Sequence, residues 1–111
     1  MDSFEVIISL KALEQLDDYI SYIQYTLLNP QAAVSVWQDA METREPLSQC
    51  AGSLSLCGHP ELRRRGYRLM RFKRHSYVML YRTDGNRAIV EAVYHRLQDY
   101  ENTFSDALDT E

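Results

Sequence analysis

The stretch GYRLMRFKRHSYVMLYRTDGNRAIVEAVYHRLQDYE, residues 66–101, decides the fold. It contains three runs with the aromatic and β-branched composition of strands, at residues 67–74, 76–82 and 88–95. Between the second and third runs, TDGN (83–86) carries Asp-Gly, a strong signal for a tight hairpin turn because both residues tolerate positive φ. The stretch therefore predicts three consecutive strands, of which the last two form a β-hairpin.

The turn also predicts which side chains share a face of the sheet. If Asp84 and Gly85 are the two loop residues, Arg82 pairs with Arg87, and side chains alternate between the two faces from there. One face is then uncharged and carries Tyr77, Met79, Tyr81, Ala88, Val90, Ala92 and Tyr94. The other face carries Val78, Leu80, Arg82, Arg87, Ile89, Glu91, Val93 and His95. We expect helices to cover the uncharged face and the mixed face to be open.

The N-terminal half predicts one strand followed by two helices. FEVIISL (4–10) is apolar and β-branched, which is typical of a strand. From Lys11, apolar residues recur at spacings of three and four, as in an amphipathic helix. Asn29 and Pro30 suit the cap and the first turn of a second helix, which Pro46 ends or kinks. The order β-α-α-β-β-β indicates an α+β fold, with a helical hairpin packed on one face of a mainly antiparallel sheet.

Length and composition indicate one domain over residues 1–111, with an acidic tail from about residue 98. No apolar run reaches the length of a membrane span, and the N-terminus lacks the basic start and cleavage site of a signal peptide. We therefore expect a cytoplasmic protein without a membrane partner. Cys50 and Cys57 have no second pair or His cluster at metal spacing, so we expect free thiols and neither a metal nor another cofactor.

The charge is distributed unevenly along the chain. The net charge is −4, yet seven of the twelve Lys and Arg residues lie between Arg63 and Arg74. Such a basic band attracts polyanions or acidic partners, although a solvated charged surface is the simpler alternative. The residues predicted to bind nucleic acid or a partner are Arg63, Arg64, Arg65, Arg68, Lys73, Arg74 and Tyr100.

The segment PELRRRGYRLMRFKRHSYVMLYRTDGNRAIVEAVYHRLQDYE, residues 60–101, resembles the end of RelE/ParE toxins of bacterial type II toxin–antitoxin systems. Shared features are the basic Gly-Tyr-Arg entry, the Tyr-aliphatic-Tyr strand, the Val-rich last strand and the closing Asp-Tyr. The resemblance extends over almost the whole chain, and some members of the superfamily are known as plasmid stabilisation proteins. It implies a microbial-RNase-like sheet with a concave basic surface, and an antitoxin encoded in the same operon.

The resemblance implies one of two targets. One branch of the superfamily cleaves ribosome-bound mRNA, and the other inhibits DNA gyrase. The cleaving branch commonly carries an arginine on the middle strand, where this chain has Val78. Our leading hypothesis is a metal-independent, ribosome-dependent mRNA interferase, that is, an endoribonuclease. The alternatives are a gyrase inhibitor without chemistry of its own and a toxin fold that has lost toxicity.

Cleavage of RNA through its 2′-hydroxyl needs groups that transfer protons and cations that stabilise the developing charge. His95 is the predicted acid or base because histidine titrates near neutral pH. Arg71, Arg82 and Arg96 would stabilise phosphate charge, and Glu91 would orient His95. The alternative for Glu91 is an ion pair with Arg82 or Arg71, and the alternative for His95 is a strand-end histidine hydrogen-bonded to the tail.

Overall fold

The sheet of this protein has four strands in the order β1-β4-β3-β2, in a computed structural model that describes residues 3–109. The strands are β1 (Glu5–Ile8), β2 (Arg68–Arg71), β3 (Tyr77–Asp84) and β4 (Arg87–His95). β1 runs parallel to β4, whereas β4 is antiparallel to β3, and β3 is antiparallel to β2. The first strand therefore lies beside the last, and the predicted α+β fold with a mainly antiparallel sheet is confirmed.

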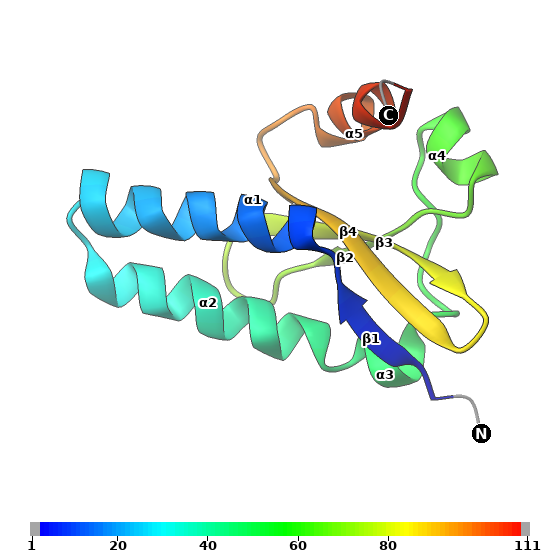
Figure 1. Ribbon diagram of the computed structural model, residues 1–111, viewed down its shortest axis with the longest axis horizontal. Coiled ribbons are helices and arrows are strands. Elements are labelled where there is room, and N and C mark those ends of the chain that lie inside the picture. Colours follow the sequence, from blue (N-terminus) through cyan, green and yellow to red (C-terminus); the bar gives the residue numbers. More distant parts are fainter. Residues whose placement is uncertain (1–2, 110–111) are drawn as a thin grey trace.

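The predicted helical hairpin consists of α1 (Leu10–Ser21), its π-helical extension η1 (Tyr22–Thr26) and α2 (Pro30–Arg44). Figure 1 shows the two helices side by side, extending beyond the sheet. Three shorter helices complete the fold: α3 (Leu47–Cys50), α4 (Pro60–Arg64) and α5 (Tyr100–Asp109). Every helix within residues 3–109 is too short or too polar to cross a membrane.

The connection between the two long helices combines a predicted cap with a strained residue. The Asn29 side chain accepts the N–H of Ala32 at 3.1 Å, and Pro30 occupies the first turn of α2. Leu28, just before the cap, has a φ of 54°, and its side chain is 78% exposed. This left-handed conformation costs a residue with a Cβ roughly 1–2 kcal/mol, and the exposed leucine side chain offsets little of it.

Leu28→Gly is therefore expected to raise the free energy of unfolding by up to about 1 kcal/mol, since glycine adopts positive φ without a steric cost. For a chain of this size, that gain corresponds to a melting temperature about 4 °C higher in a thermal denaturation scan. Leu27→Gly is the matched control, because Leu27 is also exposed but has a φ of −86°. A lower melting temperature in both variants would show that Leu28 is not strained.

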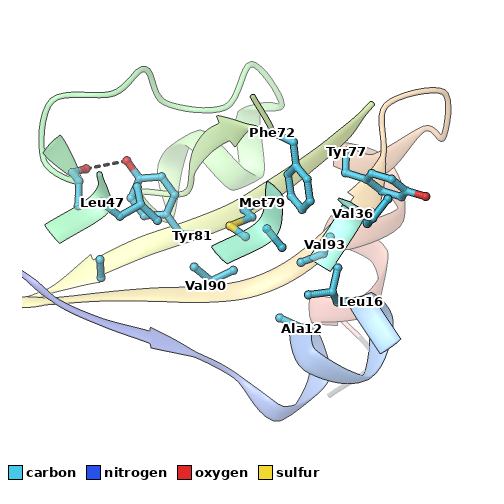
Figure 2. Packing of buried hydrophobic residues seen from close by; sticks show 13 residues of the cluster. Ala12, Leu16, Val36, Leu47, Phe72, Tyr77, Met79, Tyr81, Val90 and Val93 are labelled. Carbon is cyan, nitrogen blue, oxygen red and sulfur yellow. Dashed lines mark hydrogen bonds between the residues drawn. The ribbon is translucent and has the colours of Figure 1, made fainter. Parts of the chain in front are cut away.

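One face of the sheet packs against the helical hairpin and α3. Ala12 and Leu16 of α1 and Val36 of α2 are buried against the sheet (Figure 2). The core cluster on this face also contains Ala40, Leu47, Ala51, Phe72, Tyr77, Met79, Tyr81, Ala88, Val90 and Val93. Tyr81 is fully buried, and its hydroxyl donates a hydrogen bond to the carbonyl of Ala51 at 2.8 Å. The hydroxyl is thus satisfied inside the core.

The opposite face of the sheet is covered as well, so the prediction of an open face is wrong. A second core cluster contains Cys57, Leu62, Tyr67, Val78, Leu80, Ala92, Tyr94 and Phe104. Leu62 comes from α4 and Phe104 from α5, and both pack in this second cluster. Figure 1 shows α4 and α5 close to each other and apart from α2. The acidic tail predicted from about residue 98 thus contributes a helix that seals this face.

A β-bulge changes the pairing of β3 and β4. Tyr81 pairs with Val90, but Leu80 pairs with Ala92, so Glu91 is the extra residue. The main-chain N–H of Val93, beside the bulge, donates to the side-chain oxygen of Gln15 at 2.9 Å. α1 therefore supplies a hydrogen-bond partner for a backbone group next to the irregularity.

Because of the bulge, the predicted assignment of side chains to the two sheet faces is wrong beyond Glu91. The hairpin loop is Gly85-Asn86 rather than Asp84-Gly85, which shifts each pairing by two residues and so preserves the faces as far as Val90. After the bulge the alternation is reversed, since Val93 packs with the hairpin-side cluster. Ala92 and Tyr94 pack on the other side of the sheet.

Candidate functional site

Basic side chains gather at the end of the sheet where β2 ends, β3 begins and β4 ends. We call them the basic end: Arg71, Lys73, Arg74, His75, His95 and Arg96. Strand pairing brings them together, because Arg71 lies opposite Val78 and His95 opposite Tyr77. The N–H of Arg96 also donates to the carbonyl of Ser76 at 2.8 Å. Residues separated by about 25 positions in the sequence thus form one surface.

The loop between β2 and β3 is held by a buried carboxylate on α2. Asp39 is fully buried, and its two oxygens accept the main-chain N–H groups of Lys73 at 3.1 Å, Arg74 at 3.0 Å and His75 at 2.7 Å. The hydroxyl of Thr43 donates to the same carboxylate at 3.4 Å. Our sequence analysis missed Asp39, although its position three residues after the inward-facing Val36 was a usable signal.

Two more side chains of α2 contact the same loop. Ser35 Oγ lies 2.9 Å from Nε2 of His75, and Glu42 pairs with Arg74 at 2.6 Å. The spacing of Ser35, Asp39 and Glu42 places them on successive turns of one helix face. Glu42 and Arg74 are both about half exposed, so this ion pair contributes little to stability.

Three cations of the basic end are available to a partner. Arg71, Lys73 and Arg96 are exposed. Among residues 3–109 none of the three has a carboxylate within ion-pair distance. Their charges are therefore not neutralised locally and can attract a polyanion or an acidic surface.

His95 is half-buried at the end of β4. Its Nδ1 accepts the N–H of Leu97 at 3.1 Å, and its own main-chain N–H donates to Gln98 at 2.8 Å. The ring stands edge-on to Tyr77, with the ring centroids 5.2 Å apart. This geometry matches the alternative of a histidine hydrogen-bonded to the tail, and its acid–base role stays a prediction.

Glu91 and Arg82 lie away from the basic end. Arg82 forms an ion pair with Glu91, and the Tyr67 hydroxyl donates to the same carboxylate at 3.1 Å. Burial and the nearby Glu91 raise the pKa of Tyr67 to about 12. Four residues of strand separate Glu91 from His95, or about 13 Å, and the bulge puts them on opposite faces. The predicted contact between Glu91 and His95 is therefore not formed, and Glu91 pairs with Arg82 instead.

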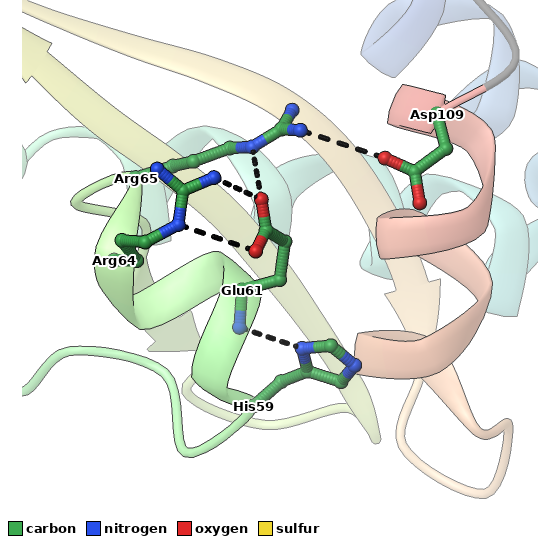
Figure 3. Close-up of polar contacts among 5 residues, drawn as sticks. All are labelled: His59, Glu61, Arg64, Arg65 and Asp109. Carbon is green, nitrogen blue, oxygen red and sulfur yellow. Dashed lines mark hydrogen bonds and ion pairs between the residues drawn. The ribbon is translucent and has the colours of Figure 1, made fainter.

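Two of the three consecutive arginines of the basic band, Arg64 and Arg65, belong to a separate cluster of ion pairs at α4 (Figure 3). Glu61 accepts hydrogen bonds from Arg64 and Arg65, and Arg65 also pairs with Asp109 of α5 at 3.5 Å. The hydrogen bond from Arg64 lowers the pKa of Glu61. Arg63 donates to the carbonyl of Cys57 at 3.5 Å. The basic band is thus divided, and two of the α4 arginines are paired locally.

Two further predicted binding residues contribute to the fold. Arg68 donates a hydrogen bond to the carbonyl of Leu54 and so holds the preceding loop. Tyr100 is half-buried against the second core cluster. Both cysteines are free, as predicted, and residues 3–109 contain no group of three or more His, Cys, Asp or Glu placed to hold a metal ion.

The family model described as the ParE toxin of the type II toxin–antitoxin system parDE matches residues 6–100. The chain belongs to this ParE toxin family. A solved structure of the chromosomal ParDE system from P. aeruginosa shares the fold with a TM-score of 0.70 at 22% identity, covering 84% of this chain and 96% of that chain. The RelBE2 toxin–antitoxin complex from Mycobacterium tuberculosis gives a TM-score of 0.57 at 23% identity, covering 88% and 97%. No curated sequence matches the chain.

The helical hairpin of this ParE-family toxin carries a second candidate surface. Residues 19–38 contain no charged side chain, although charged residues make up 25% of the chain. An apolar groove between α1 and α2 is lined by Leu13, Asp17, Ile20, Gln24, Ala33, Val34 and Trp37. Tyr25 is 70% exposed and Trp37 44% exposed. We call this surface the hairpin groove, and an apolar patch of this kind marks an interaction site.

Proposed function

We propose that this toxin inhibits DNA gyrase by binding, without chemistry of its own. The observation that supports this choice is the apolar filling of the sheet face on which we expected the cleavage residues. Val78, Leu80 and Ala92 are fully buried there, and Phe104 of α5 packs in the same cluster. A phosphodiester cannot reach groups beneath this layer, which counts against cleavage chemistry on that face.

The basic end also suits binding better than cleavage. RNA cleavage needs a base, an acid and cations at one place. Here Glu91 and Arg82 pair with each other elsewhere, which leaves His95 without a carboxylate partner among residues 3–109. The exposed Arg71, Lys73 and Arg96 still provide a positive surface for an acidic or polyanionic target. The competing function, mRNA cleavage, now rests on His95 and its neighbouring arginines.

The deciding experiment induces the toxin without its antitoxin and assays both targets. We expect purified toxin to block supercoiling by purified gyrase and to accumulate gyrase–DNA cleavage complexes, while the 5′ ends of cellular mRNA stay unchanged. New mRNA 5′ ends that disappear with His95→Ala would instead establish the mRNA interferase. Normal growth, intact mRNA and active gyrase would establish a toxin fold without toxicity.

We further propose that the cognate antitoxin, encoded in the same operon, occupies the hairpin groove. The groove is apolar and lies between two helices, which suits the apolar face of an amphipathic helix. Asp17 is the one charged residue among those that line the groove within residues 3–109, and residues 19–38 carry no charge, which lowers the desolvation cost of covering it. The solved ParDE and RelBE2 structures are of toxin–antitoxin systems, which supports an antitoxin as the partner of this chain.

Trp37→Glu is expected to weaken antitoxin binding by at least about 30-fold, because an aromatic residue in a groove is a typical hot spot worth 2 kcal/mol or more. The substitution leaves the basic end untouched, so gyrase inhibition by the free toxin should persist. Gln38→Glu is the matched control, since it adds the same charge at the neighbouring exposed position. Isothermal titration with purified antitoxin measures both variants. An unchanged Kd for Trp37→Glu would place the antitoxin elsewhere.

A further inference from the structure

Asp39 is a carboxylate in an apolar setting. It is fully buried on the face of α2 that also buries Val36 and Ala40. A buried charge is costly unless it is fully hydrogen-bonded. Asp39 meets this condition with three main-chain N–H groups and one hydroxyl. The fold thus retains a buried charge whose backbone partners all lie in the loop of the basic end.

The three N–H groups come from consecutive residues, Lys73, Arg74 and His75. Successive amides that point toward one anion form a nest, an arrangement that proteins use to bind anions. Here the anion is internal. The carboxylate therefore fixes the backbone of the loop and offsets the repulsion among the clustered cations of the basic end.

The other contacts of α2 with this loop act on side chains. Ser35 bonds the ring of His75, and Glu42 pairs with the exposed guanidinium of Arg74. Only Asp39 accepts main-chain N–H groups of the loop among the side chains of residues 3–109. Beside the main-chain bonds of the loop, this carboxylate therefore constrains the directions in which Lys73 and Arg74 leave the backbone.

We infer that Asp39 is a positioning residue of the toxin, which holds the β2–β3 loop so that the basic end meets its target in one geometry. The inference rests on the proposed function, because it takes the basic end as the surface that contacts gyrase. It adds a residue that is out of reach of the target and has no charge on the surface. Its effect on the target is transmitted through the loop.

Two variants of Asp39 give graded expectations for the backbone. The Oδ2 atom accepts from both Arg74 and His75, whereas Oδ1 accepts from Lys73 and Thr43. In Asp39→Asn, the one remaining side-chain oxygen accepts the most main-chain hydrogen bonds when it occupies the Oδ2 position. Of the three amides, only that of Lys73 then loses its acceptor. In Asp39→Ala all three amides lose it. Loss of a bond to a charged acceptor corresponds to roughly 10–100-fold faster local hydrogen exchange.

The experiment measures amide hydrogen exchange and gyrase inhibition on the purified toxin. We expect faster exchange at Lys73 in Asp39→Asn, and at Lys73, Arg74 and His75 in Asp39→Ala, with the β3 amides still protected. Gyrase inhibition should fall about 10-fold or more in Asp39→Ala. Glu45→Gln, which removes an exposed carboxylate at the C-terminal end of α2, is the control and should change neither. Formate, added as a carboxylate that fits the space left in Asp39→Ala, should restore both protection and inhibition, which a general loss of stability would not allow.

Each contrary result has a distinct meaning. Unchanged hydrogen exchange at the three amides in Asp39→Ala would show that the Asp39 carboxylate does not hold the loop backbone. Released amides with full gyrase inhibition overturn the positioning role. If the wild-type toxin leaves gyrase active, the proposed function fails. The exchange data then still test whether Asp39 holds the loop backbone. Growth arrest by the variants tests whether Asp39 positions the basic end toward another target. If Asp39→Ala does not fold, the change expected at Lys73 in Asp39→Asn decides the matter.

Discussion

Phe104→Ala is expected to lower the free energy of unfolding by about 3–5 kcal/mol, the range for removing a buried aromatic side chain. Phe104 is 1% exposed and packs edge-on against Tyr67 at a centroid distance of 5.0 Å. The Lys11 ammonium lies 5.6 Å above its ring. Domains of this kind have a total stability of about 5–15 kcal/mol, so the variant should be close to unfolding at growth temperature. Urea denaturation followed by circular dichroism measures the effect.

Leu97→Ala is the control for this variant. Leu97 is 90% exposed, and substitutions at such positions usually change stability by less than about 0.5 kcal/mol. If Phe104→Ala costs under 1 kcal/mol, α5 does not seal the second face in solution. That face would then be accessible, and mRNA cleavage would become the better-supported function.

The double variant Arg71→Glu/Arg96→Glu is expected to reduce gyrase inhibition at least about 100-fold. Both residues are exposed and have no carboxylate partner within residues 3–109, so their reversal should leave the fold intact. At an interface, close charge pairs have coupling energies of about 1.5 kcal/mol or more each, and reversal adds repulsion. The measurement is the toxin concentration that halves supercoiling activity, with thermal denaturation as a check of folding.

The control is Arg44→Glu/Arg87→Glu, which changes the net charge by the same amount at exposed arginines outside the basic end. We expect this control to stay within a few fold of the wild type. Equal losses in both double variants would indicate that net charge, rather than the basic end, governs inhibition. Full inhibition by Arg71→Glu/Arg96→Glu would exclude the basic end as the contact surface.

The sequence predicted the elements of this fold well because their apolar periods are local signals. The helical spacing after Lys11 placed the helical hairpin correctly. The Asp-Gly pair predicted the β-hairpin correctly, but its loop is Gly85-Asn86 rather than Asp84-Gly85. The bulge at Glu91 was not predictable in the same way. The N–H of Val93 beside the bulge is hydrogen-bonded by Gln15, a residue 78 positions away, so no local sequence pattern indicates the bulge.

The candidate site was predicted in part for a related reason. Strand order brings Arg71, His95 and Arg96 to one end of the sheet, as adjacent strands require. Glu91 and Arg82 were misplaced relative to His95 because a single bulge reverses every later side chain. Asp39 was missed because its partners are main-chain groups 34–36 residues away, which carry no side-chain signature.

The two-sided use of α2 has a consequence for how toxin and antitoxin pairs can diverge. Ala33, Val34 and Trp37 line the hairpin groove, whereas Ser35, Asp39 and Glu42 hold the loop of the basic end. These two sets alternate along the helix, but they share no position. With the antitoxin in the hairpin groove, as we propose, a toxin of this architecture can change its recognition of an antitoxin through the groove positions while its loop-holding residues stay as they are. Single substitutions on this one helix can then give new toxin–antitoxin pairs whose members no longer bind the original partners.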